Sequence, residues 1–106
     1  MVVSNEIYGN LSRKLFVSLL QYADRLKDRL IVCNSPSKTF NVSGSACGYG
    51  VMPNPSVLAR YKEIQLWKYT VIPSYYSMLT VKACYNHGRK WLKETKDYIS
   101  ENLLML

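Results

Sequence analysis

The sequence lacks any Cys-x-x-Cys pair among its three cysteines. The three are Cys33, Cys47 and Cys84. An odd number without paired spacing argues against a disulfide scaffold and fits a reducing cytoplasm. The spacing is also unlike that of compact zinc sites, even with His87 three residues after Cys84. We therefore expect a cytoplasmic protein without a metal site.

The chain also has no long hydrophobic run and few acidic residues. No apolar run approaches the ~20 residues of a membrane span, and residues 1–6 do not resemble a signal peptide. Seven Asp and Glu against 14 Lys and Arg in 106 residues give a formal charge of +7. Nucleic-acid binding needs basic residues gathered on one face among exposed aromatics. The nearest approach, Arg60, Lys62 and Lys68, reads as a solvated helix face, so we expect neither a membrane nor a nucleic-acid partner.

One long stretch lacks charge almost entirely. Between Leu30 and Ala59 the one charged residue is Lys38, although the chain average of 20% charged residues would place about six there. Such a gap predicts a segment buried on both sides. A single lysine in it is costly unless it has a function.

Hydrophobic periodicity predicts strands in the first half of the chain, separated by one helix. Residues 1–7 are prone to form a strand, and Ser12 is placed to cap a helix whose apolar residues extend to Leu26. Residues 30–33 form a short apolar run typical of a buried strand. We expect a polar turn over 34–41 and a second inner strand over 43–52.

The second half predicts three helices. A cap and a proline at 54–55 open a helix to about residue 68, and the sequence at 71–73 breaks it. A second helix runs from 74 to about 86 and stops at Gly88; the third begins at Arg89. Its outer face offers two i,i+4 ion pairs, Lys90 with Glu94 and Lys93 with Asp97. The element order predicts an α/β fold with a sheet at one end and helices at the other.

Lys38 lies in the segment SPSKTFN, residues 35–41. A lysine amine is nucleophilic only when neutral, and desolvation lowers its pKa from ~10.4. A loop between buried strands, rich in small hydroxylated residues, would supply that setting and donors for a phosphate, as a Schiff base with an aldehyde cofactor requires. The alternative is a lysine that extends from a turn into solvent.

This segment resembles the cofactor-lysine signature of pyridoxal-phosphate enzymes of the class I/II aminotransferase fold, and more narrowly of the cystathionine β-lyase (C–S lyase) branch. Two other segments agree in order. Residues 3–8, VSNEIY, are similar to the upstream strand end of the family, which normally reads Asp-Glu-Ile and then His or Tyr. Residues 84–99 resemble the helices that lead into the small domain. The resemblance covers nearly the whole chain.

The resemblance implies a role for four residues. Lys38 matches the lysine that binds the pyridoxal 5′-phosphate aldehyde and carries the substrate α-proton. Ser35 matches the position that binds the cofactor phosphate. Tyr8 matches the phenol that aminotransferases place against the cofactor 3-hydroxyl, where C–S lyases more often have His; a packed aromatic is the alternative. Asn5 stands where the family places Asp to keep the pyridine nitrogen protonated, and a neutral amide cannot supply that charge.

The resemblance further implies part of a three-layer, fold-type I large domain over residues 1–73, followed by helices at 74–106 leading to a small domain. We expect an internal fragment of a C–S lyase that eliminates a thiol, pyruvate and ammonia from an amino-acid substrate such as cystathionine, inactive alone. An aminotransferase fragment and a non-catalytic basic binding protein remain alternatives. Because relatives are dimers with shared active sites, the resemblance implies a second copy of the chain as partner; a complementing fragment is the alternative partner.

Overall fold

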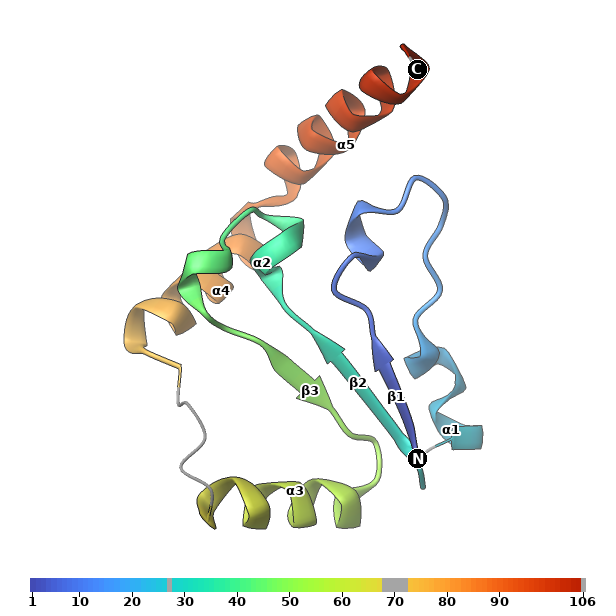
Figure 1. The fold of residues 1–106 in the computed structure, drawn as a ribbon, viewed down its shortest axis with the longest axis vertical. Coiled ribbons are helices and arrows are strands. Elements are labelled where there is room, and N and C mark those ends of the chain that lie inside the picture. The colour runs from blue at the N-terminus through green and yellow to red at the C-terminus, as the bar shows by residue number, and fades with distance from the viewer. Residues whose placement is uncertain (27, 68–72, 106) are drawn as a thin grey trace.

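The chain forms a small mixed sheet with helices around it (Figure 1). The computed structural model describes residues 1–26, 28–67 and 73–105. The strands are β1 (Val2–Asn5), β2 (Leu30–Asn34) and β3 (Tyr49–Val51). The helices and 3-10 turns are η1 (Gly9–Leu11), η2 (Leu19–Tyr22), α1 (Ala23–Leu26), α2 (Pro36–Thr39), η3 (Ser43–Ser45), α3 (Pro55–Trp67), α4 (Tyr75–His87) and α5 (Arg89–Leu104). The α/β prediction is confirmed.

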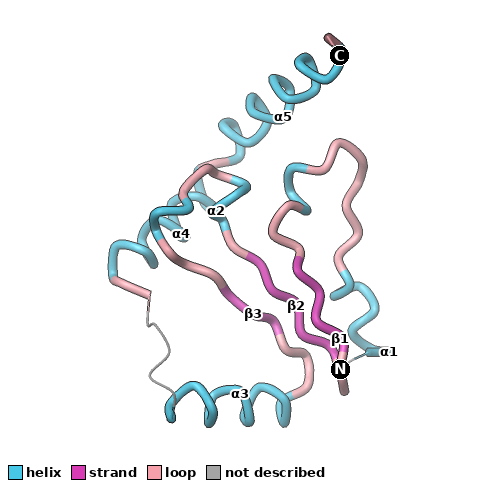
Figure 2. The backbone as a smooth tube through the Cα atoms, viewed as in Figure 1, coloured by secondary structure: helices cyan, strands magenta, loops and turns pink. Residues whose placement is uncertain are grey.

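The strand order is β1-β2-β3, with β2 in the centre. β1 and β2 are parallel, and Val2 pairs with Leu30 while Asn5 pairs with Cys33. β3 is antiparallel to β2. Because β1 and β2 run in the same direction, their carboxyl ends meet at one edge of the sheet. The segments that follow these two strands therefore begin side by side (Figures 1 and 2).

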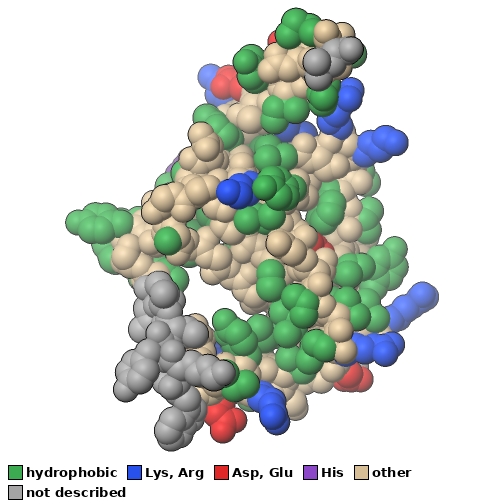
Figure 3. All heavy atoms as spheres, viewed as in Figure 1, with side chains coloured by type: hydrophobic (Ala, Val, Ile, Leu, Met, Phe, Trp, Pro, Cys, Tyr) green, Lys and Arg blue, Asp and Glu red, His purple; other side chains and the backbone are tan. Residues whose placement is uncertain are grey.

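The hydrophobic core of the described residues is very small. Its buried apolar side chains are Leu30 and Val32 of the central strand and Pro36 of α2. The radius of gyration is 16.0 Å, compared with about 13 Å for a compact domain of about 100 residues. Figure 3 shows hydrophobic side chains at the surface over much of one face, with Lys and Arg side chains spread around it. This surface is more apolar and more open than that of a self-contained domain.

The helix predicted from Ser12 to Leu26 forms over its second part alone, as η2 and α1. Ser12 ends the 3-10 turn η1, and the serine that caps a helical turn is Ser18, whose Oγ accepts a hydrogen bond from Leu20 N at 3.1 Å. Leu15, assigned to the buried face, is 93% exposed. The reason is tertiary, because the carboxylate of Glu6 accepts a 2.9 Å hydrogen bond from Leu19 N and fixes where the turn begins.

The uncharged segment 30–59 is not buried on both sides, contrary to the prediction. The strand predicted over residues 43–52 shrinks to β3, whose three residues are all exposed, and residues 43–45 form η3 instead. β3 lies at the edge of the described sheet, so one side of it has no neighbouring strand there. Small residues and glycine in this segment therefore reflect an open edge and turns rather than an inner strand.

The three predicted helices of the second half are confirmed, with the ion pairs of α5 at 3.8 Å (Lys90–Glu94) and 2.7 Å (Lys93–Asp97). Lys68 and most of the predicted break at 71–73 lie outside the described residues. Gly88 ends α4, but any residue can adopt its φ of −79°. Within the ranges described above, no helix has the length and apolar character needed to span a membrane.

Candidate active site

The predicted site residues lie at the carboxyl ends of β1 and β2. Asn5 is the last residue of β1 and pairs with Cys33, and the next amide, Glu6 N, donates to Cys33 O at 2.9 Å. Ser35 follows β2 directly. Tyr8 and Lys38 come three residues after Asn5 and Ser35, respectively. Ligands bind preferentially at such an edge of parallel strands, so the topology favours a site here.

Residues 35–41 form a single helical turn that is capped at both ends, and not the polar turn predicted. Ser35 is the N-cap of α2, and its Oγ accepts a 3.1 Å hydrogen bond from Ser37 N. Pro36 occupies the first helical position, which needs no N–H donor. At the other end Asn41 has a left-handed φ of 54°, and Val42 N donates to Ser37 O at 3.0 Å. This is a Schellman arrangement, in which asparagine is tolerated.

The short helix α2 presents Lys38 to solvent. The side chain is exposed, so the predicted burial of this lysine is wrong for the described residues. Its Nζ donates a 3.3 Å hydrogen bond to Ser43 Oγ, a neutral partner. Ser43 was not among the predicted site residues. The available sequence signal was Asn41, a residue type that tolerates the left-handed φ adopted here, between Lys38 and Ser43.

Ser35 is buried, with 7% of its surface exposed. Its hydroxyl donates a 2.6 Å hydrogen bond to Cys47 O and accepts the bond from Ser37 N. A hydroxyl has a single proton to donate, so a phosphate could receive it only in exchange for the Cys47 bond. The phosphate-binding role of Ser35 stays a prediction, whereas its role as a helix cap is present in the structure.

Asn5 and Tyr8 are both accessible. Asn5 is exposed, and its Oδ1 accepts a 3.3 Å hydrogen bond from Ile7 N. This bond holds the side-chain amide of Asn5 near the start of the segment that follows β1. Tyr8 is 63% exposed, so the alternative of a packed aromatic is wrong. The roles of both residues toward a cofactor stay predictions.

Two further polar residues hold the site edge together, and neither was predicted. Thr39 of α2 is fully buried, and its Oγ1 accepts a 3.5 Å hydrogen bond from Asn10 Nδ2. This bond joins the segment after β1 to the helix after β2. Glu6 is 6% exposed and binds Ser4 Oγ at 3.1 Å in addition to Leu19 N. Neither the Asn10–Thr39 bond nor the Leu19–Glu6 bond has a local sequence signal, because the partners are 29 and 13 residues apart, respectively.

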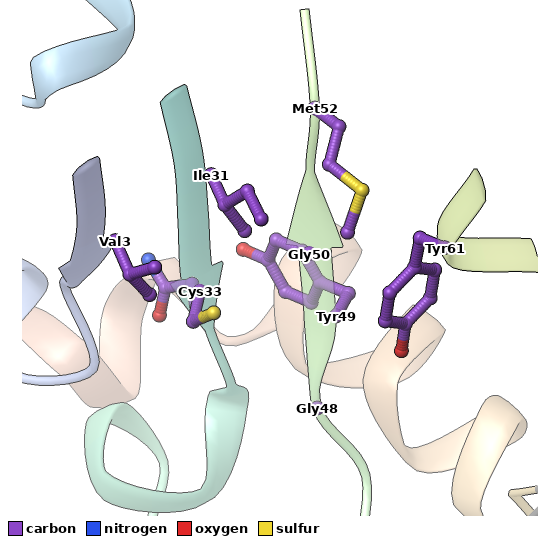
Figure 4. Close-up of a pocket in the computed structure, with 9 residues that line it drawn as sticks. Val3, Ile31, Cys33, Gly48, Tyr49, Gly50, Met52 and Tyr61 are labelled. Carbon is purple, nitrogen blue, oxygen red and sulfur yellow. The ribbon is translucent and has the colours of Figure 1, made fainter. Parts of the chain in front are cut away.

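A pocket of about 450 Å³ opens on one face of the sheet. Val3, Ile31 and Cys33 line it from β1 and β2, and Met52 and Tyr61 close the other side (Figure 4). The residues with predicted roles, Lys38 among them, do not line this pocket. Its lining is mainly apolar, so it belongs to the open face of the sheet rather than to the candidate site.

An aromatic cluster lies beside α2. Phe40, the C-cap of α2, packs edge-on against Tyr85 of α4 with ring centroids 5.7 Å apart. Tyr85 and Tyr49 share a 3.0 Å hydrogen bond between their hydroxyls. Burial, and then the hydroxyl of Tyr49, raise the pKa of Tyr85 above its ordinary value of 10.0. Burial likewise raises the pKa of the Cys84 thiol.

The cysteines and acidic residues do not form a metal centre in the part of the chain that the structure describes. No three His, Cys, Asp or Glu side chains are grouped there so as to hold an ion. Cys33, Cys47 and Cys84 are present as free thiols.

Comparison with known proteins identifies the family. The family model described as "Aminotransferase class I and II" matches residues 1–106, so the chain belongs to the class I and II aminotransferases. This family depends on pyridoxal 5′-phosphate, as the resemblance implied, and its fold is that of the fold-type I enzymes.

Individual relatives point to the same group. The chain is 28% identical over 107 residues to cystathionine β-lyase PatB of Bacillus subtilis (strain 168), covering 96% of this chain and 27% of PatB. The crystal structure of OvoB superposes with a TM-score of 0.89 at 28% identity, over 99% of this chain and 28% of OvoB. Cystalysin from Treponema denticola, whose structure contains pyridoxal 5′-phosphate, shares the fold with a TM-score of 0.91 at 23% identity, over 99% of this chain and 27% of cystalysin. The chain thus spans about a quarter of the length of these relatives.

The residues at the site edge fit a pyridoxal phosphate group. Lys38 offers an exposed primary amine whose hydrogen-bond partner, Ser43, is uncharged, so an aldehyde can reach it. The Ser43 hydroxyl lies beside this amine, and the Asn10 amide binds Thr39, the next residue of α2. Asn5 and Tyr8 add an exposed amide and an exposed phenol at the end of the neighbouring strand.

Proposed function

We propose that this chain carries the lysine-bearing part of the active site of a pyridoxal-phosphate-dependent C–S lyase. The reaction cleaves the C–S bond of cystathionine or another cysteine S-conjugate and, with uptake of one water, releases a thiol, pyruvate and ammonia. The observation that carries the proposal is the capped turn α2, which presents Lys38 at the carboxyl end of β2. Membership of the family and the 28% identity to a cystathionine β-lyase support the substrate class.

Each of the four residues has a distinct part in this proposal. Lys38 binds the aldehyde carbon of the cofactor through Nζ and, once displaced by substrate, carries the α-proton on the same nitrogen. Tyr8 hydrogen-bonds the 3-hydroxyl of the cofactor, and Ser35 its phosphate. The cofactor ring, when bound, supplies an electron sink for the substrate carbanion.

Asn5 limits the rate of that chemistry. An amide can donate a hydrogen bond to the ring nitrogen but cannot hold a positive charge there, as a carboxylate does. The electron sink is therefore weaker than in relatives with Asp at this position. We propose an enzyme of low activity, or a chain that binds the cofactor without turnover.

The complete reaction belongs to a larger assembly in our proposal. The chain spans about a quarter of its relatives, and its buried apolar core among the described residues is limited to Leu30, Val32 and Pro36. We propose that residues 1–73 belong to a cofactor-binding domain and residues 74–106 lead toward a small domain. Further polypeptide, from a complementing fragment or a second copy, covers the exposed apolar surface.

Tyr8 favours one alternative reaction. Aminotransferase relatives have a phenol at this position, and Tyr8 is exposed where it would reach a cofactor. An aminotransferase would share Lys38 and the cofactor but return a keto acid that keeps its sulfur substituent.

Borohydride trapping tests cofactor binding. The purified chain is incubated with pyridoxal 5′-phosphate, reduced, digested and analysed by mass spectrometry. We expect the label at Lys38, and little on Lys62, an exposed lysine of α3 that serves as the internal control. Labelling that is equal at the two lysines would contradict a cofactor site.

The product separates the two reactions. With cystathionine as substrate, a lyase releases pyruvate and a free thiol, whereas an aminotransferase releases neither and consumes a keto acid. We expect pyruvate and thiol in equal amounts from the chain assembled with its complementing polypeptide. Lys38→Ala should abolish both products.

A further inference from the structure

Phe40 contacts the junction between α4 and α5 as well as the helix that carries Lys38. It is the C-cap of α2, and its amide donates to Pro36 O at 2.9 Å. Its ring meets Tyr85 of α4 edge-on, with an interplanar angle of 88°, and lies 6.0 Å from the ring of Trp91 of α5. One side chain therefore joins the lysine helix to two residues, Tyr85 and Trp91, that lie more than 40 positions further along the chain.

Gly88 provides the space into which this ring fits. It sits between α4 and α5, and a Cβ at this position would collide with the Phe40 ring and with the carbonyl oxygen of Cys84. Since its φ of −79° suits any residue, glycine is needed here for close approach and not for backbone freedom. The absence of a side chain forms a notch that holds Phe40.

The same cluster is tied to the sheet. Tyr85 bonds the hydroxyl of Tyr49, the first residue of β3, at 3.0 Å, and the two rings lie 6.2 Å apart. The ring of Phe40 thus rests on a support fixed at three points, on β3, α4 and α5. Such a support moves little unless those elements move together.

α2 needs this support, because one helical turn does not hold itself in water. Its first end is held by the cap bond from Ser37 N to Ser35 Oγ, which does not use the hydroxyl proton, and its last end by Phe40. Lys38 projects between these two anchors, two residues before Phe40. We propose that Phe40, seated against Gly88, is a positioning residue that sets the place of the Lys38 amine.

This inference rests on the proposed function. It implies that the position of the α4–α5 junction affects the position of the reactive lysine through Phe40. A shift of that junction, for example when further polypeptide packs on α5, moves the Phe40 ring and with it the end of α2. The lysine would then be placed by contacts outside its own loop.

The test compares Phe40→Leu with Phe40→Tyr, which keeps the ring. Two quantities are measured on the full chain: hydrogen exchange at the Val42 amide, which bonds Ser37 O, and the ratio of borohydride-trapped cofactor on Lys38 to that on Lys62. We expect Phe40→Leu to raise the exchange rate of the Val42 amide and to lower the Lys38 to Lys62 labelling ratio, each by about fivefold or more. A change of this size corresponds to the loss of about one packing contact. Phe40→Tyr should stay within about twofold of wild type on both measures.

The outcomes are separable. If wild type shows no preference for Lys38, the proposed function fails, and the exchange at Val42 alone decides the positioning role. If Phe40→Leu also raises exchange at Val32, in the centre of the sheet, the chain has unfolded globally. Trp91→Leu, which alters the support without touching α2, then decides by the same two measures. Unchanged exchange and labelling in the deciding variant would overturn the proposal.

Discussion

The hydroxyl of Ser35 donates a 2.6 Å hydrogen bond to the carbonyl oxygen of Cys47, 12 residues further along the chain. Ser35 Oγ also accepts the hydrogen bond from Ser37 N that starts α2. One buried hydroxyl therefore caps the helix of Lys38 and fastens it to the segment that leads into β3. Ser35, which was identified by its resemblance to a cofactor-binding residue, therefore also stabilises the local structure.

Replacement of Ser35 by Ala should lower the free energy of unfolding by about 1–2 kcal/mol, because the helix loses its cap and Cys47 O its donor. Urea unfolding followed by circular dichroism measures this change. Ser45→Ala is the matched control, because the Ser45 hydroxyl is buried without a hydrogen-bond partner among the described residues. It should change stability by less than about 0.5 kcal/mol or increase it. Equal losses in the two variants would contradict the anchoring role of Ser35.

Removal of the Glu6 carboxylate should destabilise the chain by about 1–3 kcal/mol. The amide of Leu19 and the hydroxyl of Ser4 would lose their acceptor in a site that is only 6% exposed. Glu6→Ala and Glu63→Ala are compared by thermal unfolding, since Glu63 lies exposed on α3. Glu63→Ala should change stability by no more than about 0.5 kcal/mol. A similar effect of both substitutions would show that Glu6 does not fix the start of η2.

Asn5→Asp should raise the rate at which the cofactor-bound chain exchanges the α-hydrogen of an amino acid with solvent. A carboxylate near the pyridine nitrogen stabilises the protonated ring, and a gain of about 1.4 kcal/mol in the transition state gives about tenfold in rate. Proton NMR in deuterium oxide follows the exchange. Asn102→Asp makes the same charge change near the end of α5, which extends away from the sheet (Figure 1), and should have no effect. A rise in both variants would mean that charge alone, and not the position of residue 5, is responsible.

Alkaline pH should destabilise the chain partly through Tyr85. Its pKa is raised in the folded state by burial and by Tyr49, so folding favours the neutral phenol. The resulting stabilisation is present below about pH 10, where the unfolded tyrosine is neutral, and is lost as the pH rises toward the folded pKa. Denaturant titrations between about pH 9 and 11 should show a shallower loss for Tyr85→Phe than for wild type.

Tyr76→Phe is the control for this titration. Tyr76 is 78% exposed, so its replacement should leave the alkaline slope of the wild type unchanged. The raised pKa of the Cys84 thiol has the same sign and is present in all three proteins, so it cancels in the comparison. An identical slope for Tyr85→Phe and wild type would contradict the role of this phenol.

Local signals in the sequence were sufficient for most of the second half of the chain. The helix α4 begins with the Ser74 cap and ends at Gly88, as predicted, and the i,i+4 pairs on α5 form. The apolar periodicity after Ser12 was misleading for residues 12–18, because Leu15 and Phe16 are exposed and the turn starts where Glu6 binds Leu19 N. Periodicity records which face is apolar, and it does not record whether anything covers that face.

The sequence by itself determined the chemistry and local form of the candidate site. Ser35, Pro36 and Asn41 encode a capped single turn through bonds between residues close in the chain, and the motif around Lys38 indicated the family that the comparison confirmed. Tertiary structure alone decided that Lys38 is exposed and that Phe40 enters the notch at Gly88. These contacts join residues tens of positions apart, and their geometry depends on how strands and helices pack, which no local pattern specifies.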